Sequence, residues 1–539
     1  NDTLTGGAGN DTLVPGAGTD TVNGGAGNDT ITLAGNWSAS DSIDGGDGTD
    51  TATVSLTQTT APTLTNVETV TASFLTGGAL NASGIASLTT LNLQETTDGT
   101  AAEATVINLP TGVTVVMTDS DAAADNDLAA TTLDTVAGAS LTVNARILTA
   151  EALTITDAAS VTINAASTGV NSGVGSTVLD NADTTSLTVT GAAGAFTLAT
   201  GAITGTDALT SYTVSTSTTS GTVTTGAMVD GDSLESLTIT ATAANATVGA
   251  VGGTGTAEAL STVTISATGA TADVDDITAD TTNSTTDNAM TVTLTATTGS
   301  TITTGDLNNQ FGSITLTASG EGTFNIGGTD GSEMLTFGQA STFDLTGSSG
   351  TTELYIQGGT ALATVTLAVQ DSTDTIGVAD DGSVAITNFQ AGASGDNIAI
   401  DVSATGTGSK ITDAGNDNDV AAGDAVVLTE LSAATDLSAA SKNDNVLVIT
   451  GITFATTALV ETALESGGSR ALNVDVDAGD ELIVVWSDGS NSYVGLLDVG
   501  TATDGTLAAG DTTMTILAEL VGVDASTAST LVAANFSFI

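Results

Sequence analysis

The first 53 residues follow a nine-residue period, and this period constrains their fold more than any other feature of the sequence. The aspartates of the period are Asp2, Asp11, Asp20 and Asp29. An aliphatic residue recurs at the same interval, at Leu4, Leu13, Val22 and Ile31. After an insertion around Trp37, the segment from Gly45 to Asp50 restates the motif. Ordinary Gly-Asn-Asp turns would not space both an acid and an aliphatic residue at nine, so the pattern predicts a parallel β-roll of stacked coils.

These repeats resemble those of the repeats-in-toxin (RTX) proteins. The resemblance implies that each unit is a six-residue turn followed by a three-residue strand, and that two units complete one coil. Turns from alternate units would then stack. We therefore expect Asp2 and Asp20 on one edge of the roll, and Asp11 and Asp29 on the other. The aliphatic residues of the period should fill the narrow interior.

The resemblance also implies calcium binding, for which the residue types are suitable. Glycines allow positive φ and let backbone carbonyls point inward. Together with carboxylates from stacked turns, these carbonyls offer an all-oxygen cage that suits a hard cation. We predict several calcium ions in the head, defined as residues 1–53, and no other cofactor. The predicted metal-binding residues are Asp2, Gly7, Gly9, Asp11, Gly16, Gly18, Asp20, Gly25, Gly27, Asp29, Gly46, Gly48 and Asp50.

A looser repetition runs through residues 54–385, where short alternations of apolar residues and Thr return regularly. Five of them begin at Val263, Val292, Ile314, Phe343 and Val365, so that a longer and a shorter interval alternate. Alternation with β-branched residues is typical of strands. Its regular return predicts an elongated parallel β-solenoid with about 20–30 residues per coil. The alternative is a string of antiparallel sandwiches, which the aromatic content of 3% disfavours because sandwich cores need bulk.

Two local segments extend the family resemblance. Residues Leu64 to Val70, Leu-Thr-Asn-Val-Glu-Thr-Val, resemble a strand common in RTX-type surface-layer proteins. Residues Ile386 to Ile398 resemble the closing segment that follows RTX repeats. In the second segment Asn388 replaces the usual Asp, and additional residues precede Asp396. The resemblance therefore leaves open whether a metal binds there.

Residues 386–539 depart from the pattern of the preceding region, and they predict a small β-rich closing domain. The segments 482–486 and 493–497 flank a Ser-Asp-Gly-Ser-Asn-Ser turn, which indicates a hairpin. A short amphipathic helix is expected from Thr456 to Glu465, with four apolar residues on one face: Leu459, Val460, Ala463 and Leu464. The apolar end, Leu531 to Ile539, resembles an uncleaved type I secretion signal. It also suits a last core strand, and the two interpretations are compatible.

Charge and missing residue types exclude several classes of function. The chain has 62 acidic and four basic residues, a net charge of −58, which excludes nucleic acid and anionic membrane surfaces as partners. With 40% hydrophobic residues the chain can still fold once cations bind or screen the acids. The absence of cysteine and histidine removes disulfides, thiolate metal sites and Ser-His-Asp chemistry. No apolar run is long enough to span a bilayer.

The head and the Thr-rich, Lys-poor composition together resemble RTX-type surface-layer (S-layer) proteins of Gram-negative bacteria such as Caulobacter. That resemblance implies a secreted, cell-surface structural protein that is not an enzyme, with further copies of itself as partners in a two-dimensional lattice. The sequence opens in mid-repeat without a visible signal peptide. A preceding region is therefore expected to be missing. An anchor to cell-surface polysaccharide would lie in that region or be supplied by a partner.

Two other functions remain open. One is a calcium-stiffened adhesin or extracellular fibre subunit. The other is a polysaccharide-modifying enzyme on a β-helix, for which paired carboxylates could serve as acid and base. The candidate acids for that enzyme are Asp273, Asp275, Asp276 and Asp280. Four basic residues in the whole chain are too few to neutralise an acidic polysaccharide, so we expect these acids to form a solvated or calcium-binding loop.

Overall fold

The structure is a computed structural model of the chain, and its secondary structure is 56% strand and 3% helix. It describes residues 1–34, 37–56, 63–74, 78–94, 103–118, 130–146, 152–165, 172–174, 176–179, 182–191, 198–217, 221–229, 231–252, 259–279, 289–309, 312–327, 335–337, 339–356, 362–369, 373–379, 383–402, 410–412, 414, 419–438, 444–501 and 503–539. The chain divides into two compact units. Unit 1 comprises Asn1–Leu260 with Gly269–Asp275, and unit 2 comprises Ser261–Thr268 with Asp276–Ile539.

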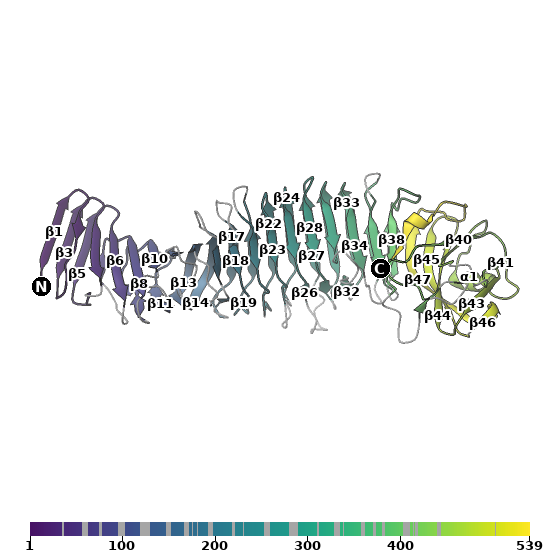
Figure 1. The fold of residues 1–539 in the computed structure, drawn as a ribbon, viewed down its shortest axis with the longest axis horizontal. Coiled ribbons are helices and arrows are strands. Elements are labelled where there is room, and N and C mark those ends of the chain that lie inside the picture. Colours follow the sequence, from purple (N-terminus) through teal and green to yellow (C-terminus); the bar gives the residue numbers. More distant parts are fainter. Residues whose placement is uncertain are drawn as a thin grey trace. The chain divides into compact units, whose positions relative to one another are not determined.

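Unit 1 begins as a roll whose strands pair in parallel on two faces (Figure 1). One sheet contains β1 (Thr3–Ala8), β3 (Thr21–Ala26), β5 (Ser42–Asp47) and β7 (Leu64–Thr65). The other face contains β2 (Thr12–Leu13), β4 (Thr30–Ala34), β6 (Thr51–Leu56) and β8 (Thr69–Phe74). Val22 and Ile31 are buried between the faces, as predicted. Leu4 and Leu13 are only half-buried, because they lie in the first coil of the stack.

The coils of unit 1 continue beyond the head as a parallel solenoid. The next strands are β9 (Ala79–Asn81), β10 (Thr90–Gln94), β11 (Ala104–Leu109), β12 (Thr114–Thr118), β13 (Thr131–Arg146), β14 (Leu153–Ala165), β16 (Thr177–Val178), β17 (Ser186–Gly191), β19 (Ile203–Thr204), β20 (Ser211–Ser215) and β22 (Ser236–Thr242). A further face appears with β15 (Ser172–Val174), β18 (Leu198–Thr200), β21 (Val223–Thr225), β23 (Ala246–Val248) and β25 (Thr271–Val274). All the pairings given for these strands are parallel, so the solenoid prediction is confirmed and the sandwich alternative is wrong.

Unit 2 carries the same architecture. One face contains β24 (Thr262–Thr268), β27 (Met290–Ala296), β30 (Ile314–Gly320), β33 (Ser341–Ser348), β35 (Leu362–Thr366) and β37 (Ser383–Thr387). The second contains β28 (Thr301–Thr304), β31 (Thr323–Ile326), β34 (Thr352–Ile356), β36 (Thr375–Val378) and β38 (Asn397–Ile400). The third contains β26 (Ile277–Ala279), β29 (Leu307–Asn309) and β32 (Thr336–Phe337).

The register of these strands corrects one predicted interval. Val263 pairs with Val292, as the first longer interval predicts. Val292 then pairs with Leu316 rather than with Ile314, because Met290 takes Ile314 as its partner. Both Ile314 and Leu316 point inward. Since side chains on one strand face repeat every second residue, the alternation alone could not distinguish the two registers.

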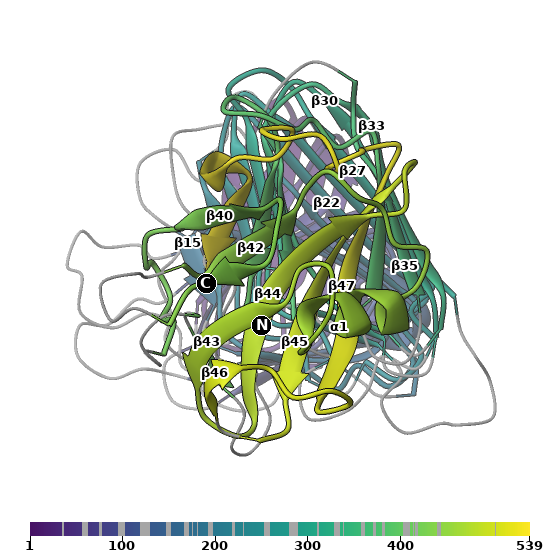
Figure 2. The ribbon, with the colours of Figure 1, turned by 90° about the vertical axis from the view of Figure 1, so that its right-hand side faces the viewer.

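A small domain is inserted before the last coil of unit 2. It comprises β39 (Lys410–Ile411), β40 (Leu428–Leu431), β41 (Thr435–Asp436), β42 (Val446–Ile449), α1 (Thr457–Leu464), β43 (Leu472–Val476), β44 (Asp480–Ser487), β45 (Ser492–Val499) and β46 (Thr503–Thr506). The predicted hairpin is β44–β45, with Leu482 opposite Leu497. Figure 2 shows α1 beside β45 and β47 (Thr512–Val521).

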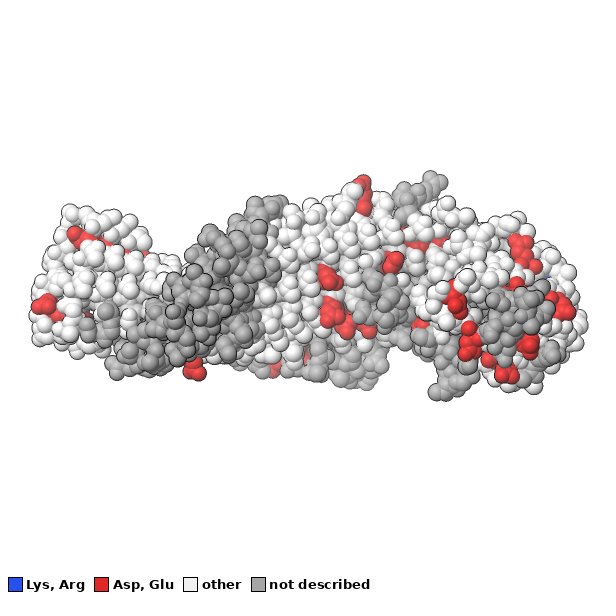
Figure 3. Space-filling model, viewed as in Figure 1, with Lys and Arg blue, Asp and Glu red and all other residues white. Residues whose placement is uncertain are grey.

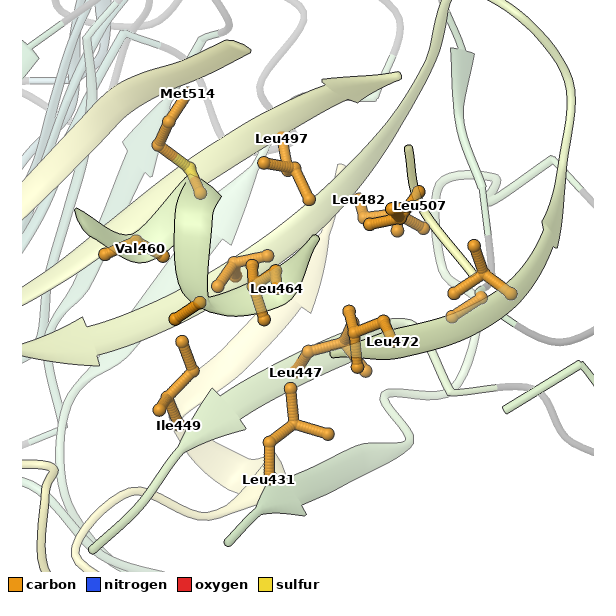
Figure 4. Close-up of a cluster of buried hydrophobic side chains, with 14 of the residues drawn as sticks. Leu431, Leu447, Ile449, Val460, Leu464, Leu472, Leu482, Leu497, Leu507 and Met514 are labelled. Carbon is orange, nitrogen blue, oxygen red and sulfur yellow. The ribbon is translucent and has the colours of Figure 1, made fainter. Parts of the chain in front are cut away.

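The inserted domain has a core of its own, drawn in Figure 4. Val460 and Leu464 of α1 meet Leu447 of β42 and Met514 of β47 in this cluster. The predicted helix is confirmed, but Leu459 is 51% exposed and not part of the buried face. At about 100° per residue, Leu459 lies at the margin of the apolar stripe, whereas Val460, Ala463 and Leu464 lie within it.

The chain then returns to the solenoid. In β47, Ala518 pairs in parallel with Val384 of β37. In β48 (Phe536–Phe538), Phe536 pairs in parallel with Ile398 of β38. Both phenylalanines of β48 are buried. The apolar end of the sequence is therefore a core strand of the solenoid, and its predicted role in secretion stays a prediction.

Candidate metal centre

The pairing of the head strands brings alternate turns together. Leu4 of β1 pairs with Val22 of β3, and Leu13 of β2 pairs with Ile31 of β4, so each residue meets its equivalent two repeats later. Two nine-residue units therefore make one coil, and successive aspartates alternate between two edges. The insertion around Trp37 lengthens the next coil, as the pairing of Val22 with Ile43 shows.

On one edge the carboxylates form a continuous ladder with the backbone of the coil before. The Asp11 N–H donates to Oδ1 of Asp29 at 2.8 Å, and the Asp29 N–H donates to Oδ1 of Asp50 at 2.7 Å. The Asp50 N–H in turn donates to Oε2 of Glu68 at 2.9 Å. One oxygen of each stacked carboxylate thus fixes the spacing between coils. We call Asp11, Asp29, Asp50 and Glu68 the ladder edge.

The second oxygen of these aspartates has no protein partner. Oδ2 of Asp11, of Asp29 and of Asp50 is buried and accepts no hydrogen bond. An anionic oxygen removed from water without a partner costs several kcal/mol. Three such oxygens in successive coils are therefore the donor set that a hard cation would complete. Residues of this kind fit calcium, which takes six to eight oxygen ligands.

The glycines of the turns allow this close packing. All eight predicted glycines have positive φ, between 84° and 145°. A Cβ on Gly25 would lie 2.0 Å from the Gly7 carbonyl oxygen, so no side chain fits between the coils. A second set, which sequence reasoning missed, is the first glycine of each Gly-Gly pair. A Cβ on Gly24 would lie 2.3 Å from Oδ2 of Asp29, so Gly24 makes room for the unpartnered oxygen.

Comparison with known proteins agrees with this geometry. Residues 1–31 match the family described as RTX calcium-binding nonapeptide repeat, in four copies. These are RTX repeats, and RTX repeats bind calcium. No curated protein and no solved structure matches the chain. Among the described residues, no helix is long and apolar enough to cross a membrane.

The opposite edge of the RTX repeats is built differently. The Asp2 N–H donates to Oδ1 of Asp20 at 2.6 Å, and the Asp20 N–H donates to Oδ1 of Asp41 at 2.8 Å. Oδ2 of Asp41 also has a partner, the Ser38 N–H at 2.8 Å. We call Asp2, Asp20 and Asp41 the capped edge. Asp41 was not predicted, because the insertion moves it off the nine-residue period, although the order Trp-Ser-Ala-Ser-Asp offers an acid at the next stacked position.

Sequence explains the difference between the edges. The ladder edge has complete turns, Gly-Gly-Ala-Gly-Asn-Asp twice and then Gly-Gly-Asp-Gly-Thr-Asp. On the capped edge Pro15 replaces the first glycine of one turn, and the Trp37 insertion replaces the glycines of the next. The structure places the predicted residues on both edges. Of the aspartates on the two edges of the head, however, only Asp11, Asp29 and Asp50 on the ladder edge have a buried carboxylate oxygen without a hydrogen-bond partner.

The electrostatics of the ladder edge also favour a cation. Burial raises the pKa of Asp50, the hydrogen bond from the Asp29 N–H partly offsets this, and repulsion by Asp29, Glu68 and Asp44 raises the pKa further. Within the described part of the chain, no three acidic side chains converge on one point. An ion between coils would therefore take most of its ligands from backbone carbonyls, with one or two carboxylates.

In the closing segment, both oxygens of the Asp396 carboxylate accept backbone hydrogen bonds. Asp396 is 1% exposed, and its Oδ1 accepts the Asp374 N–H at 3.1 Å while its Oδ2 accepts the Gln390 N–H at 2.7 Å. Asn388, the residue that departs from the family pattern, has φ of 67° and donates from Nδ2 to the Leu367 carbonyl at 3.0 Å. Both oxygens of Asp396 thus bind the backbone, and the segment offers no free carboxylate oxygen there.

Three of the four acids considered for an enzyme lie in the described residues. Asp273 lies on β25 opposite Thr247, and its pKa is raised by burial and then by the nearby Asp275. Oδ1 of Asp276 accepts the Asp306 N–H at 3.0 Å, which is a structural role. Asp280 lies outside the described residues.

Proposed function

We propose that this chain is a structural subunit of a calcium-dependent extracellular surface layer, in which copies of the chain associate into a two-dimensional lattice. The observation that carries the proposal is the ladder edge, where buried carboxylate oxygens without partners are built into the stack of coils. A protein with this edge reaches its final fold only where calcium is abundant. Such conditions are extracellular, because extracellular calcium modules bind at about 0.1–1 mM.

The charge of the chain supports calcium as the agent of assembly. Lys and Arg number four against 62 acids, and the described face in Figure 3 shows acidic side chains on both units. Arg470 directs its donors to the backbone carbonyls of Leu431 and Thr450, at 3.0 and 2.9 Å. Two copies side by side would repel unless cations bridge or screen them. Monovalent salt screens over roughly 8 Å, whereas calcium can bridge carboxylates of two chains.

The coil interior supports a structural role. It is filled by ladders of aliphatic residues such as Ile265 and Leu294, which pair in register and are fully buried. Such stacking adds rigid length with each repeat, which suits a scaffold. We further propose that a type I exporter reads the apolar C-terminal segment. Attachment to cell-surface polysaccharide would use a region outside this sequence.

Negative-stain imaging of the full chain tests this function. We expect ordered sheets in millimolar calcium, and none in sodium chloride at matched ionic strength. A calcium-sensitive control is the same sample after addition of chelator, which should dissolve the sheets. Folded single particles in calcium would contradict the lattice and favour a calcium-stiffened adhesin, and fibres would favour a fibre subunit. Turnover of any glycan in a panel would favour the polysaccharide-modifying enzyme instead.

A further inference from the structure

We propose that the segment from Leu64 to Glu68, which lies beyond the matched nonapeptide repeats, completes an additional calcium site with Asp50. The ligands would be Oδ2 of Asp50, the Glu68 carboxylate and the Asn66 backbone carbonyl. Further oxygens would come from the carbonyls of the turn that ends at Asp50. The segment has no Gly-Gly pair and no aspartate, so the nonapeptide pattern does not reveal it.

The geometry of the segment continues that of the RTX repeats. In successive coils the N–H of Asp11, Asp29 and Asp50 donates to the carboxylate one coil on, at 2.8, 2.7 and 2.9 Å. The third acceptor is Glu68. The carbonyl contacts also continue, since a Cβ on Gly24 would lie 2.2 Å from the Gly45 carbonyl oxygen, and one on Gly45 would lie 2.1 Å from that of Asn66. Asn66 thus takes the backbone position of a turn glycine.

The unpartnered oxygen points to a ligand. Asp50 is 0% exposed, and its Oδ2 is buried without a hydrogen-bond partner. Its other oxygen is occupied by the Asp29 N–H. Water cannot satisfy a fully buried oxygen unless a site is built for it, and the neighbouring charges are also negative. A cation between Asp50 and Glu68 resolves both the missing partner and the repulsion.

The shortened turn explains why glutamate replaces aspartate. From Gly45 to Asp50 the turn has four intervening residues, whereas from Asn66 to Glu68 it has one. Asn66 has φ of 50°, the left-handed conformation that asparagine tolerates better than most residues. Val67 is buried, and its N–H donates to Oγ of Ser87 at 2.9 Å, which anchors the turn on the next coil. A longer side chain then reaches the Asp50 N–H from this tighter backbone.

The test uses the full chain and counts bound calcium. Glu68→Gln keeps an oxygen that can accept the Asp50 N–H but removes the charge. Equilibrium dialysis with radioactive calcium should show one ion fewer per chain than in the unchanged protein, with hydrogen-exchange protection of residues 1–34 retained. The control is Glu103→Gln, at an exposed glutamate, which should leave the count unchanged.

Two results would overturn the proposal. An unchanged calcium count in Glu68→Gln would show that the segment binds no ion. Loss of all head ions together with the protection of residues 1–34 would make Glu68 a structural cap of the roll instead. The proposal rests on the calcium binding in the proposed function but not on the lattice. A protein that loses one ion in the variant yet never forms sheets would contradict the lattice alone.

Discussion

Asp50 accepts the backbone N–H of Asp29 with one carboxylate oxygen and leaves the other buried and unpartnered. Asp41, on the opposite edge, accepts N–H groups with both oxygens, from Asp20 and Ser38. The two carboxylates therefore differ in what they still need. Asp50 needs a cation, whereas Asp41 is satisfied by the chain itself. The edges of this roll are chemically unequal, although the same repeat underlies both.

The inequality predicts unequal effects of neutralising one acid on each edge. Asp29→Asn keeps an acceptor for the Asp11 N–H but removes charge from the ladder edge. We expect at least a tenfold loss of calcium affinity, about 1.4 kcal/mol. Asp41→Asn should change calcium affinity by less than that. Isothermal titration calorimetry on the full chain measures both, and equal losses would show that bulk charge rather than the ladder holds the ions.

Two glycine variants, Gly25→Ala and Gly16→Ala, distinguish a steric clash between coils from the cost of positive φ in the head. Gly25→Ala would place a Cβ 2.0 Å from the Gly7 carbonyl oxygen, so the first two coils cannot stack. We expect no calcium-induced β signal from the head at any calcium concentration. Gly16 also has positive φ, 84°, but nothing lies within 4 Å of its Cβ position. Gly16→Ala should cost only about 1–2 kcal/mol and fold at higher calcium. Difference circular dichroism distinguishes the outcomes, and two equally impaired variants would contradict the close packing.

The solenoid interior of unit 2 should be sensitive to loss of volume. Ile265 of β24 is fully buried and pairs in register with Leu294 of β27. Ile265→Ala should lower the free energy of unfolding by about 2–5 kcal/mol. Leu362 of β35 is 49% exposed, so Leu362→Ala is the matched control and should cost less than about 1 kcal/mol. Urea denaturation in calcium compares them, and similar midpoints would argue against a packed interior.

The hairpin turn of the inserted domain should depend on pH. Hydrogen bonds from the Asn491 and Ser490 N–H groups, and then from the Tyr493 hydroxyl, hold the pKa of Asp488 below its usual range. A lowered pKa in the folded state stabilises the turn above the unfolded-state pKa of about 3.9, and this stabilisation is lost as pH falls through the folded value.

Tryptophan fluorescence can follow that loss. Trp486 stacks on Tyr493 with ring centroids 5.3 Å apart, so it reports on the turn. In a Trp37→Phe background, Asp488→Asn should lower the urea midpoint at pH 7 and should lower it less at about pH 2, below the unfolded-state pKa. A difference of equal size at both pH values would mean that the charge of Asp488 is not the cause.

The sequence predicted the head well because its period encodes the coil directly. The resemblance to RTX repeats implied the alternate edges, and the glycines indicated the turns. It missed Asp41, because the additional residues around Trp37 break the period while the strands still pair across the longer coil. It missed the role of Glu68 for a related reason. In the turn from Asn66 to Glu68, the backbone of Asn66 takes the stacked position, and no residue type of the nonapeptide repeat marks it.

The end of the chain could not be predicted from local patterns. Val384 pairs with Ala518 across the whole inserted domain, and Asn535 is fully buried and donates from Nδ2 to the Asp396 carbonyl at 2.7 Å. Neither contact joins residues that are related by a sequence repeat. Long-range pairing of this kind depends on which edge of the solenoid is open, and residue spacing carries no information on that.

Hydrogen exchange on the full chain tests whether calcium on the ladder edge completes the fold of the head. With calcium, the amides of Asp11 and Asp29, which donate to the next carboxylate, should be protected. In chelator we expect them to exchange freely, while amides of β27 in unit 2 stay protected, because aliphatic packing holds that part of the solenoid. Equal protection of the Asp11 and Asp29 amides in calcium and in chelator would show that calcium does not complete the fold of the head.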